Sequence, residues 1–364
     1  MRRYGGIART HRSKTMSGVD TKNSDFALQR ELLAKVSRTF ALTIPALPDR
    51  LERVVGNAYL LCRIIDTIED AAELDADAQA EFFQQFIAVV KGTADAGAFA
   101  RALAPEVAGH ASADECRLIE HTPRVLAITA GFSAEEQAAL ADCITTMGQG
   151  MARFQRCKSR HGLANLAEHS EYCYVVAGCV GEMLTRLFIA HVPQLAARRR
   201  ELMRLAVAFG QCLQMTNILK DFWEDSADGV CWLPRDVFAE QGLDLAAVRP
   251  GDPRFVRGYR RLLGVARACD NDALAYVLLL PERETAMRNF CLWALYMAVL
   301  TQRKIAARPG FGRGEAVKIS RRSVRLSVAW SRLAAGQDKA LKASFALLER
   351  GLPDAEPATL ERSA

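Results

Sequence analysis

The chain has 364 residues, a length that by itself would suit two domains. Half of the residues are apolar and a quarter are charged, as in ordinary soluble globular proteins. The mild net charge of +6 suits an anionic substrate or an anionic membrane surface. Nucleic-acid binding is not expected, because the chain has no zinc-finger spacing, RNP-like run or basic heptad pattern.

Residues 1–24 are basic and show no apolar periodicity, which predicts a disordered N-terminal tail. The tail lacks the apolar h-region of a secretory signal, and an amphipathic transit segment is the alternative. The longest fully apolar run, at residues 290–300, is shorter than the roughly 20 residues of a spanning helix. We therefore expect no transmembrane anchor and a cytoplasmic location, and we leave peripheral association with the inner membrane face open.

From residue 26 onward the apolar residues are spaced by three and four, and β alternation bounded by turns is absent. The chain is therefore predicted to be all-α. Clusters of Pro, Gly and Asp predict breaks at 45–48, 91–97, 192–194, 226–234, 248–253, 281–284 and 308–314. Because no linker divides the chain, we expect one helical domain over residues 25–345, followed by a loose tail at 346–364.

The ten cysteines include no CxxC pair, and most lie within apolar runs. This pattern predicts reduced thiols in the core, and neither a disulfide framework nor a cysteine metal site.

The first predicted helix with a chemical pattern covers residues 57–70. Its polar stripe, at about 100° per residue, is Tyr59, Arg63, Asp66 and Asp70, and the opposite stripe is apolar. Asp66 and Asp70 are one turn apart, so both carboxylates can reach one divalent ion, and oxygen ligands that leave room for waters and phosphates suit Mg²⁺. The alternative is an amphipathic surface helix with a solvated charged face.

A second such helix covers residues 210–225. Gln214, Asn217, Asp221 and Asp225 share one stripe, and nearly all the rest of the circumference is apolar. Such a helix is buried, and a buried carboxylate needs partners. Cations bound between the two helices would provide them, since four carboxylates around one cavity repel each other. A structural polar network is the alternative.

Six segments between residues 35 and 325 carry the most specific signal. They are SRTF at 37–40, DTIED at 66–70, YCYVVAGCVG at 172–181, QMTNILKDFWED at 214–225, FC at 290–291 and VKI at 317–319. In this order they resemble the motifs of the squalene/phytoene synthase family, in the form typical of its squalene synthase branch. The resemblance implies a single-domain, isoprenoid-synthase-type helical bundle around a central cavity.

The resemblance also implies residue roles. Asp66, Asp70, Asp221 and Asp225 would bind Mg²⁺ and the diphosphates of two farnesyl diphosphates, with Glu69 and Glu224 as auxiliary ligands. Tyr172 would transfer a proton or steer a cation. The other expected substrate-binding residues are Ser37, Arg38, Phe40, Tyr59, Arg63, Ala177, Gly178, Val180, Gly181, Gln214, Asn217, Lys220 and Phe290. Alternatively, the aromatic residues among them belong to the core, and the glycines only permit close helix packing.

The implied reaction is the head-to-head (1′–1) condensation of two farnesyl diphosphates through presqualene diphosphate, followed by reduction with NADPH to squalene. No GxGxxG motif follows a strand, so the cofactor would need a basic helical pocket, for which Lys318 and Arg321 are the candidates. The excess of basic residues at 303–332 would instead suit anionic lipid or be a solvated face.

The chain departs from the family pattern at three places. Lys220 replaces the usual Arg, Val230 stands where the family usually has another Arg, and Ala294-Leu295 replaces Pro-Gln. Two other functions are compatible with the same sequence motifs. One is a condensing enzyme that stops before reduction, making dehydrosqualene, phytoene or presqualene diphosphate, and the other is a non-catalytic assembly protein derived from the family.

Overall fold

The regular secondary structure consists of helices throughout the part of the chain that the computed structural model describes, residues 18–37, 40–71 and 73–356. Its α-helices are α1 (Gly18–Val36), α2 (Phe40–Thr43), α3 (Asp49–Glu69), α4 (Ala76–Val90), α5 (Ala96–Val107), α6 (Ala113–Glu120), α7 (Thr122–Ala130), α8 (Ala134–Cys157), α9 (Leu166–Cys173), α10 (Cys179–His191), α11 (Arg199–Ala227), α12 (Arg235–Ala239), α13 (Pro253–Leu279), α14 (Thr285–Ala307), α15 (Arg321–Ala334) and α16 (Asp338–Leu348). Short 3-10 turns are η1 (Ile44–Ala46), η3 (Pro193–Arg198), η4 (Leu245–Ala247) and η5 (Gly314–Val317), and η2 (Tyr174–Gly178) is a π-helical turn. The all-α prediction is confirmed.

Helix ends follow local sequence signals. α6 and α8 each begin with a capping box, Ser112 with Glu115 and Ser133 with Glu136, which satisfies backbone N–H groups in the first turn. The helices α4, α10 and α11 end at residues 90, 191 and 227, at or within the breaks predicted from Pro, Gly and Asp clusters. All ten cysteines are free thiols.

The ends of the helical part differ from the predicted boundaries. α1 already begins at Gly18, inside the segment predicted to be a disordered tail, and residues 1–17 lie outside the described part. At the other end α16 continues to Leu348, and residues 349–356 are packed: Leu352 is buried, and the Glu356 N–H donates to the Gly264 carbonyl at 3.1 Å. The described part of the C-terminal segment is therefore attached to α13.

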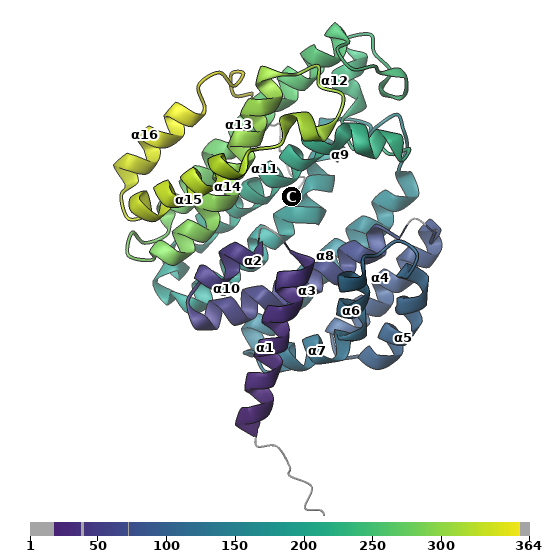
Figure 1. The fold of residues 1–364 in the computed structure, drawn as a ribbon, viewed down its shortest axis with the longest axis vertical. Coiled ribbons are helices and arrows are strands. Elements are labelled where there is room, and N and C mark those ends of the chain that lie inside the picture. The colour runs from purple at the N-terminus through teal and green to yellow at the C-terminus, as the bar shows by residue number, and fades with distance from the viewer. Residues whose placement is uncertain (1–17, 38–39, 72, 357–364) are drawn as a thin grey trace, which may run out of the picture.

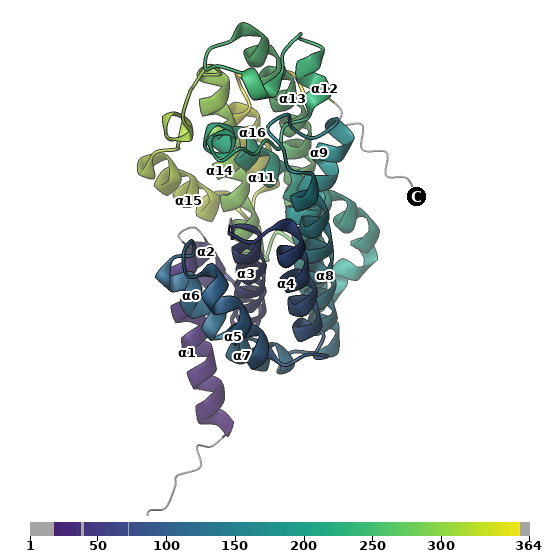
Figure 2. The same cartoon turned by 90° about the vertical axis from the view of Figure 1, so that its right-hand side faces the viewer.

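Two hydrophobic clusters form the interior, and α11 belongs to both. The larger gathers α1 to α8 with α10, α14 and the C-terminal half of α13, and the smaller surrounds the C-terminal half of α11 with α12 and the N-terminal half of α13. Leu202 and Leu205 of α11 lie in the first cluster, whereas Ile218 and Phe222 lie in the second. Figures 1 and 2 show α1 to α7 in the lower part of the molecule and α11 to α16 in the upper part.

One helical run is longer and more apolar than the longest fully apolar stretch of the sequence indicated. The continuous helical run Leu166–His191 is 26 residues long, with a mean hydropathy of 1.5 in its most apolar window, so by length and composition it suffices to cross a membrane. The apolar-run criterion missed it because isolated Glu and Arg residues interrupt the run. Half of that window is buried, and the run packs against α8 and α11 as a core helix.

Candidate active site

A cavity of about 730 Å³ opens between the C-terminal ends of α3 and α11. Six carboxylic side chains line it, against only three basic ones. The lining residues are Arg63, Asp66, Glu69, Asp70, Gln155, Lys158, Tyr172, Val176, Gln214, Asn217, Ile218, Lys220, Asp221, Asp225, Asp228, Val230 and Trp232. Both predicted aspartate pairs therefore face one cavity.

The acidic residues of α3 lie where a helix disfavours them. Asp66 and Glu69 are in its last turn and Asp70 is its C-cap, next to the negative end of the helix dipole. Burial raises the pKa of Asp66 to about 7, which nearby Asp70 and Glu115 support and Arg63 opposes. Burial and the two neighbouring aspartates raise the pKa of Glu69 to about 8, although Gln155 donates a hydrogen bond to Glu69 at 3.0 Å. The nearby basic groups therefore do not balance the negative charge of these carboxylates.

The acidic residues of α11 have the same arrangement. Burial, followed by repulsion from Asp221 and Asp228, raises the pKa of Asp225 to about 7. Asp221 pairs with Lys220, whose Nζ lies 3.0 Å from the carboxylate. Glu224 was predicted to assist in metal binding, but its Oε1 instead accepts the Gly314 N–H at 2.9 Å, outside the cavity lining. Position 224 lies on the side of α11 that packs against η5, so the role of Glu224 as an auxiliary metal ligand stays a prediction that this packing does not support.

The two acidic helix ends interact across the cavity. Asp70 contributes to the raised pKa of Asp225, and the charges of Glu69, Asp225 and Asp70 add to burial in raising the pKa of Tyr172, which lines the same cavity. Within the described ranges, no three His, Cys, Asp or Glu side chains form a ready-made metal cage. A net negative lining with six carboxylate groups nevertheless fits Mg²⁺, which keeps waters and binds through a few carboxylates together with phosphate oxygens.

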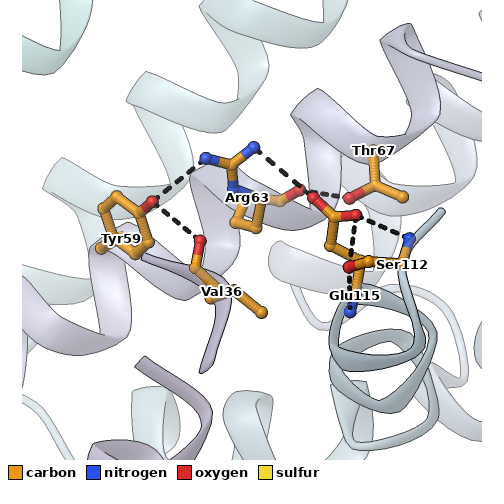
Figure 3. Close-up of polar contacts among 6 residues, drawn as sticks. All are labelled: Val36, Tyr59, Arg63, Thr67, Ser112 and Glu115. Carbon is orange, nitrogen blue, oxygen red and sulfur yellow. Dashed lines mark hydrogen bonds and ion pairs between the residues drawn. The ribbon is translucent and has the colours of Figure 1, made fainter. Parts of the chain in front are cut away.

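Arg63 is held in the cavity wall by a chain of contacts that Figure 3 shows. Its Nη2 donates to the Tyr59 hydroxyl at 3.1 Å, and Tyr59 in turn donates to the Val36 carbonyl at the end of α1. On the other side its Nη1 lies 3.7 Å from Glu115, the acid of the α6 capping box. The guanidinium is thereby fixed while Asp66 lies one turn away on the same helix.

Tyr172 forms part of an aromatic wall. Its ring stacks on Trp232, with centroids 4.1 Å apart and an angle of 11°, and Phe154 meets it edge-on at 5.1 Å. Burial raises the pKa of Tyr172 well above its ordinary value, so the hydroxyl stays protonated at neutral pH. The fully buried His169 fixes the other partner, because its Nδ1 lies 2.8 Å from the Trp232 carbonyl.

Several predicted substrate residues lie beside the cavity and not in its lining. Phe40 packs on Tyr59 and Phe290, with centroids 5.3 and 6.4 Å apart, so the structure does bring these three rings together. Ser37 is buried and its hydroxyl accepts the Phe40 N–H at 3.0 Å. Arg38 lies outside the described residues.

The small residues of η2 and α10 pack against α11. A Cβ at Gly181 would lie 2.2 Å from the Ala206 carbonyl oxygen, and one at Gly210 would lie 2.2 Å from the Ala177 carbonyl oxygen. A Cβ at Gly178 would approach Tyr174 and Val207 of this same packing. The expectation that Ala177, Gly178, Val180 and Gly181 face a prenyl chain is not met in this structure, since none of them lines the cavity.

The predicted cofactor residues also lie apart from the cavity. Lys318 follows η5 and Arg321 opens α15; both are exposed and neither is in the lining. A basic residue that the sequence did not single out, Lys158 at the end of α8, does line it.

Val230, singled out as a departure from the family pattern, lies in the lining, and six further lining residues had no signal in the sequence: Gln155, Lys158, Val176, Ile218, Asp228 and Trp232. Most come from the end of α8 and from the loop after α11, which meet where the Cys231 N–H donates to the Ser159 carbonyl at 2.9 Å. The spacing of residues along the sequence does not predict a contact between these two segments. Glu115 had a usable signal, its capping box, but that signal marks a helix start and not a site.

Comparison with known proteins gives consistent findings. Residues 33–323 match the family model described as squalene/phytoene synthase. The chain is similar to the squalene synthase BSS of Botryococcus braunii, with 30% identity over 63% of this chain and 47% of that protein. It is also similar to the squalene synthase of Eremothecium gossypii, with 28% identity over 74% of this chain and 60% of that protein. A third relative is squalene synthase ERG9 of Saccharomyces cerevisiae, with 28% identity over 80% of this chain and 64% of that protein. The chain thus spans about half to two thirds of these relatives' length.

Two solved structures share the fold. The complex of TcSQS with the ligand BPH1237 superimposes with a TM-score of 0.72 at 22% identity, covering 89% of this chain and 91% of that one. A dehydrosqualene synthase in complex with ligand gives 0.64 at 20% identity, covering 90% and 98%. These likenesses confirm the predicted helical bundle around a cavity.

Proposed function

The chain belongs to the squalene/phytoene synthase family, and on that premise we propose that it condenses two farnesyl diphosphates head to head, through presqualene diphosphate, and reduces the intermediate to squalene. The observation that carries the proposal is the single cavity into which both aspartate pairs project. The names of the relatives, which are squalene synthases, support the choice of product.

The charge of the cavity supports a substrate that arrives with divalent cations. Six acidic side chains would repel a diphosphate, so Asp66, Asp70, Asp221 and Asp225 would first have to hold Mg²⁺. When bound there, Mg²⁺ would neutralise the diphosphate and favour its departure. Arg63, Lys158 and Lys220 are the side chains of the lining that can meet the remaining phosphate oxygens.

The aromatic wall supports the chemistry that follows. A carbocation left by the departing diphosphate is stabilised by π faces, and Tyr172 with Trp232 presents them at the cavity. The Tyr172 hydroxyl stays neutral, so its oxygen can take the proton lost on cyclopropane closure while its own proton passes to the released diphosphate. Water must be kept out, because it would trap the cation as an alcohol.

The reductive half of the proposal rests on the relatives alone. Lys318 and Arg321 do not reach the described cavity, so these residues do not fit a nicotinamide cofactor bound there, and we derive no hydride step from them. The requirement for NADPH and for farnesyl chains therefore needs a direct test.

Incubation of the protein with farnesyl diphosphate and Mg²⁺, with and without NADPH, tests the proposal by mass spectrometry of the products. We expect squalene only when NADPH is present, and parallel reactions with C10 and C20 diphosphates report the accepted chain length. A C30 product that NADPH does not change would identify the non-reducing condensing enzyme. Absence of any condensation product would favour the assembly-protein alternative.

A further inference from the structure

Helix α15 carries large apolar side chains on its outer side. Leu326, Trp330 and Leu333 are 61%, 42% and 73% exposed, and they are three of the five large hydrophobic side chains exposed in the described part of the chain. At about 100° per residue they fall within an arc of roughly 60°, so they form one continuous stripe. Figures 1 and 2 both show α15 at the periphery of the molecule.

The two leucines of this stripe lie away from the face with which α15 folds, and Trp330, at its edge, also contacts Tyr296 of α14. The buried Ser331 and Ala334 and the half-buried Val324 and Val328 lie on the side that packs against α14. The Trp293 indole of α14 donates to the Ser331 hydroxyl at 2.5 Å, which fixes the rotation of α15 about its axis. Within the described residues the stripe is therefore left uncovered by a helix that is already held in place.

Basic residues lie next to the stripe. Arg322 and Arg325 fall between it and the arc that holds Arg321 and Arg332, all four are exposed, and α15 contains no acidic residue. The exposed basic residues continue upstream as Arg303, Lys304, Arg308, Arg313 and Lys318, with Glu315 as the only acid from 303 to 332. None of these nine cations forms an ion pair with a carboxylate of the described chain.

The positive charge around the stripe indicates which kind of partner can bind there. A second copy docked through the same face would bring arginines against arginines, and the chain's own N-terminal segment, with Arg2, Arg3, Arg9, Arg12 and Lys14, would be repelled as well. An apolar stripe bordered by arginines matches a helix that lies in the plane of an anionic bilayer surface, with Leu and Trp among the acyl chains and Arg at the headgroups.

We propose that α15 is a membrane-docking helix that holds the protein on an anionic lipid surface through Leu326, Trp330 and Leu333, with Arg322 and Arg325 at the headgroups. The helix lies outside the cavity lining, so the proposal is independent of the reaction proposed above. It assigns the basic stretch to lipid phosphates and not to a soluble nucleotide.

Co-sedimentation of the full chain with lipid vesicles tests this proposal without any measurement of activity. We expect the protein to bind vesicles of phosphatidylcholine with phosphatidylglycerol, to bind phosphatidylcholine alone poorly, and to be released by salt. The double variant Leu326→Gln, Leu333→Gln should bind about tenfold more weakly, and Arg322→Gln, Arg325→Gln several-fold more weakly. The emission of Trp330 should shift to shorter wavelength on binding, and Trp330→Phe should remove that shift.

The matched control is Lys91→Gln, Arg101→Gln, which removes two exposed cations near α4 and α5 and should leave vesicle binding unchanged. An unchanged thermal unfolding midpoint shows that each variant is folded. Wild-type protein that stays in the supernatant, or leucine and arginine variants that bind like wild type, would overturn the proposal. So would a wild-type dimer, seen by analytical ultracentrifugation, that the leucine variant converts to monomer.

Discussion

Asp270 of α13 is a fully buried carboxylic acid that does not line the acidic cavity. Its Oδ1 accepts hydrogen bonds from Cys212 at 2.7 Å and Gln302 at 3.1 Å, whereas Oδ2 has no partner within the described chain. Burial raises the pKa of Asp270 to about 7, so the folded state prefers the protonated form. The side chain thereby links stability to pH.

We predict the sign of this dependence. Because the folded-state pKa is above the unfolded value of about 3.9, the stabilising contribution is complete below that value and is lost as pH rises through about 7. The isosteric Asp270→Asn variant removes a slope of up to about 1.4 kcal/mol per pH unit in this window. Urea unfolding of both proteins between pH 5 and 8 measures it. Parallel curves for the two proteins would contradict the prediction.

Trp232 gives a second prediction at this scale. Its ring stacks on Tyr172 and its carbonyl is held by His169, so it positions the tyrosine that faces both acidic helix ends. Replacing Trp232 by Leu removes a stacking interaction worth about 1 kcal/mol and should lower turnover about tenfold, whereas Trp232→Phe should retain most of it. Steady-state kinetics of condensation measures the effect. A leucine variant with the turnover of wild type would show that the stack does not position Tyr172.

Some residues of the cavity were predictable from the sequence and others were not. The placement of Asp66, Asp70, Asp221 and Asp225 in one cavity was predictable, since each pair lies one turn apart on the polar stripe of a strongly patterned helix. Glu224 instead faces η5, because neighbouring acids on a helix point in different directions and their spacing does not show which one reaches the cavity. Lys158 and Trp232 depend on two loops meeting, which no local pattern encodes.

At the scale of elements, the contact between α10 and α11 sets the geometry of the cavity wall. Gly181 lies against the backbone of Ala206 and Gly210 against that of Ala177, so the two helices approach closely along a glycine-lined seam. α11 packs against η2 next to this seam, and Gln214 and Asn217 of α11 line the cavity together with Val176 of η2. The sequence indicated small residues here, but the structure assigns them to helix packing.

Gly181→Ala tests the seam. A Cβ 2.2 Å from a backbone oxygen forces the helices apart, so we expect a loss of stability of about 1–3 kcal/mol, measured by urea unfolding. The control is Gly97→Ala in α5, where the added Cβ meets only the ends of the Arg101 and Asp95 side chains at 3.2 and 3.3 Å. That variant should be neutral or slightly more stable. Equal effects of both substitutions would show that the seam is not tightly packed.

At the scale of the whole molecule, the two hydrophobic clusters joined by α11 explain why one domain forms despite a length that suits two. The periodicity predicted helices and their breaks, because Pro, Gly and capping residues act locally. The domain ends were less predictable: α1 begins at Gly18 and residues 349–356 attach to α13 through contacts distant in sequence. The arrangement of α3 against α11 likewise depends on the whole fold.

That arrangement places acidic residues at two helix C-termini, where they are unfavourable without bound cations. We propose that both helix ends act together on one diphosphate-bearing substrate. The most direct measurement is the rate of diphosphate release from farnesyl diphosphate, with Mg²⁺ and with a chelator, for the wild type, Asp66→Asn, Asp221→Asn and the double variant. We predict release that requires Mg²⁺ and falls at least about a hundredfold in each single variant, because a lost carboxylate removes both a metal ligand and its charge. Release at the wild-type rate from the double variant would contradict the claim.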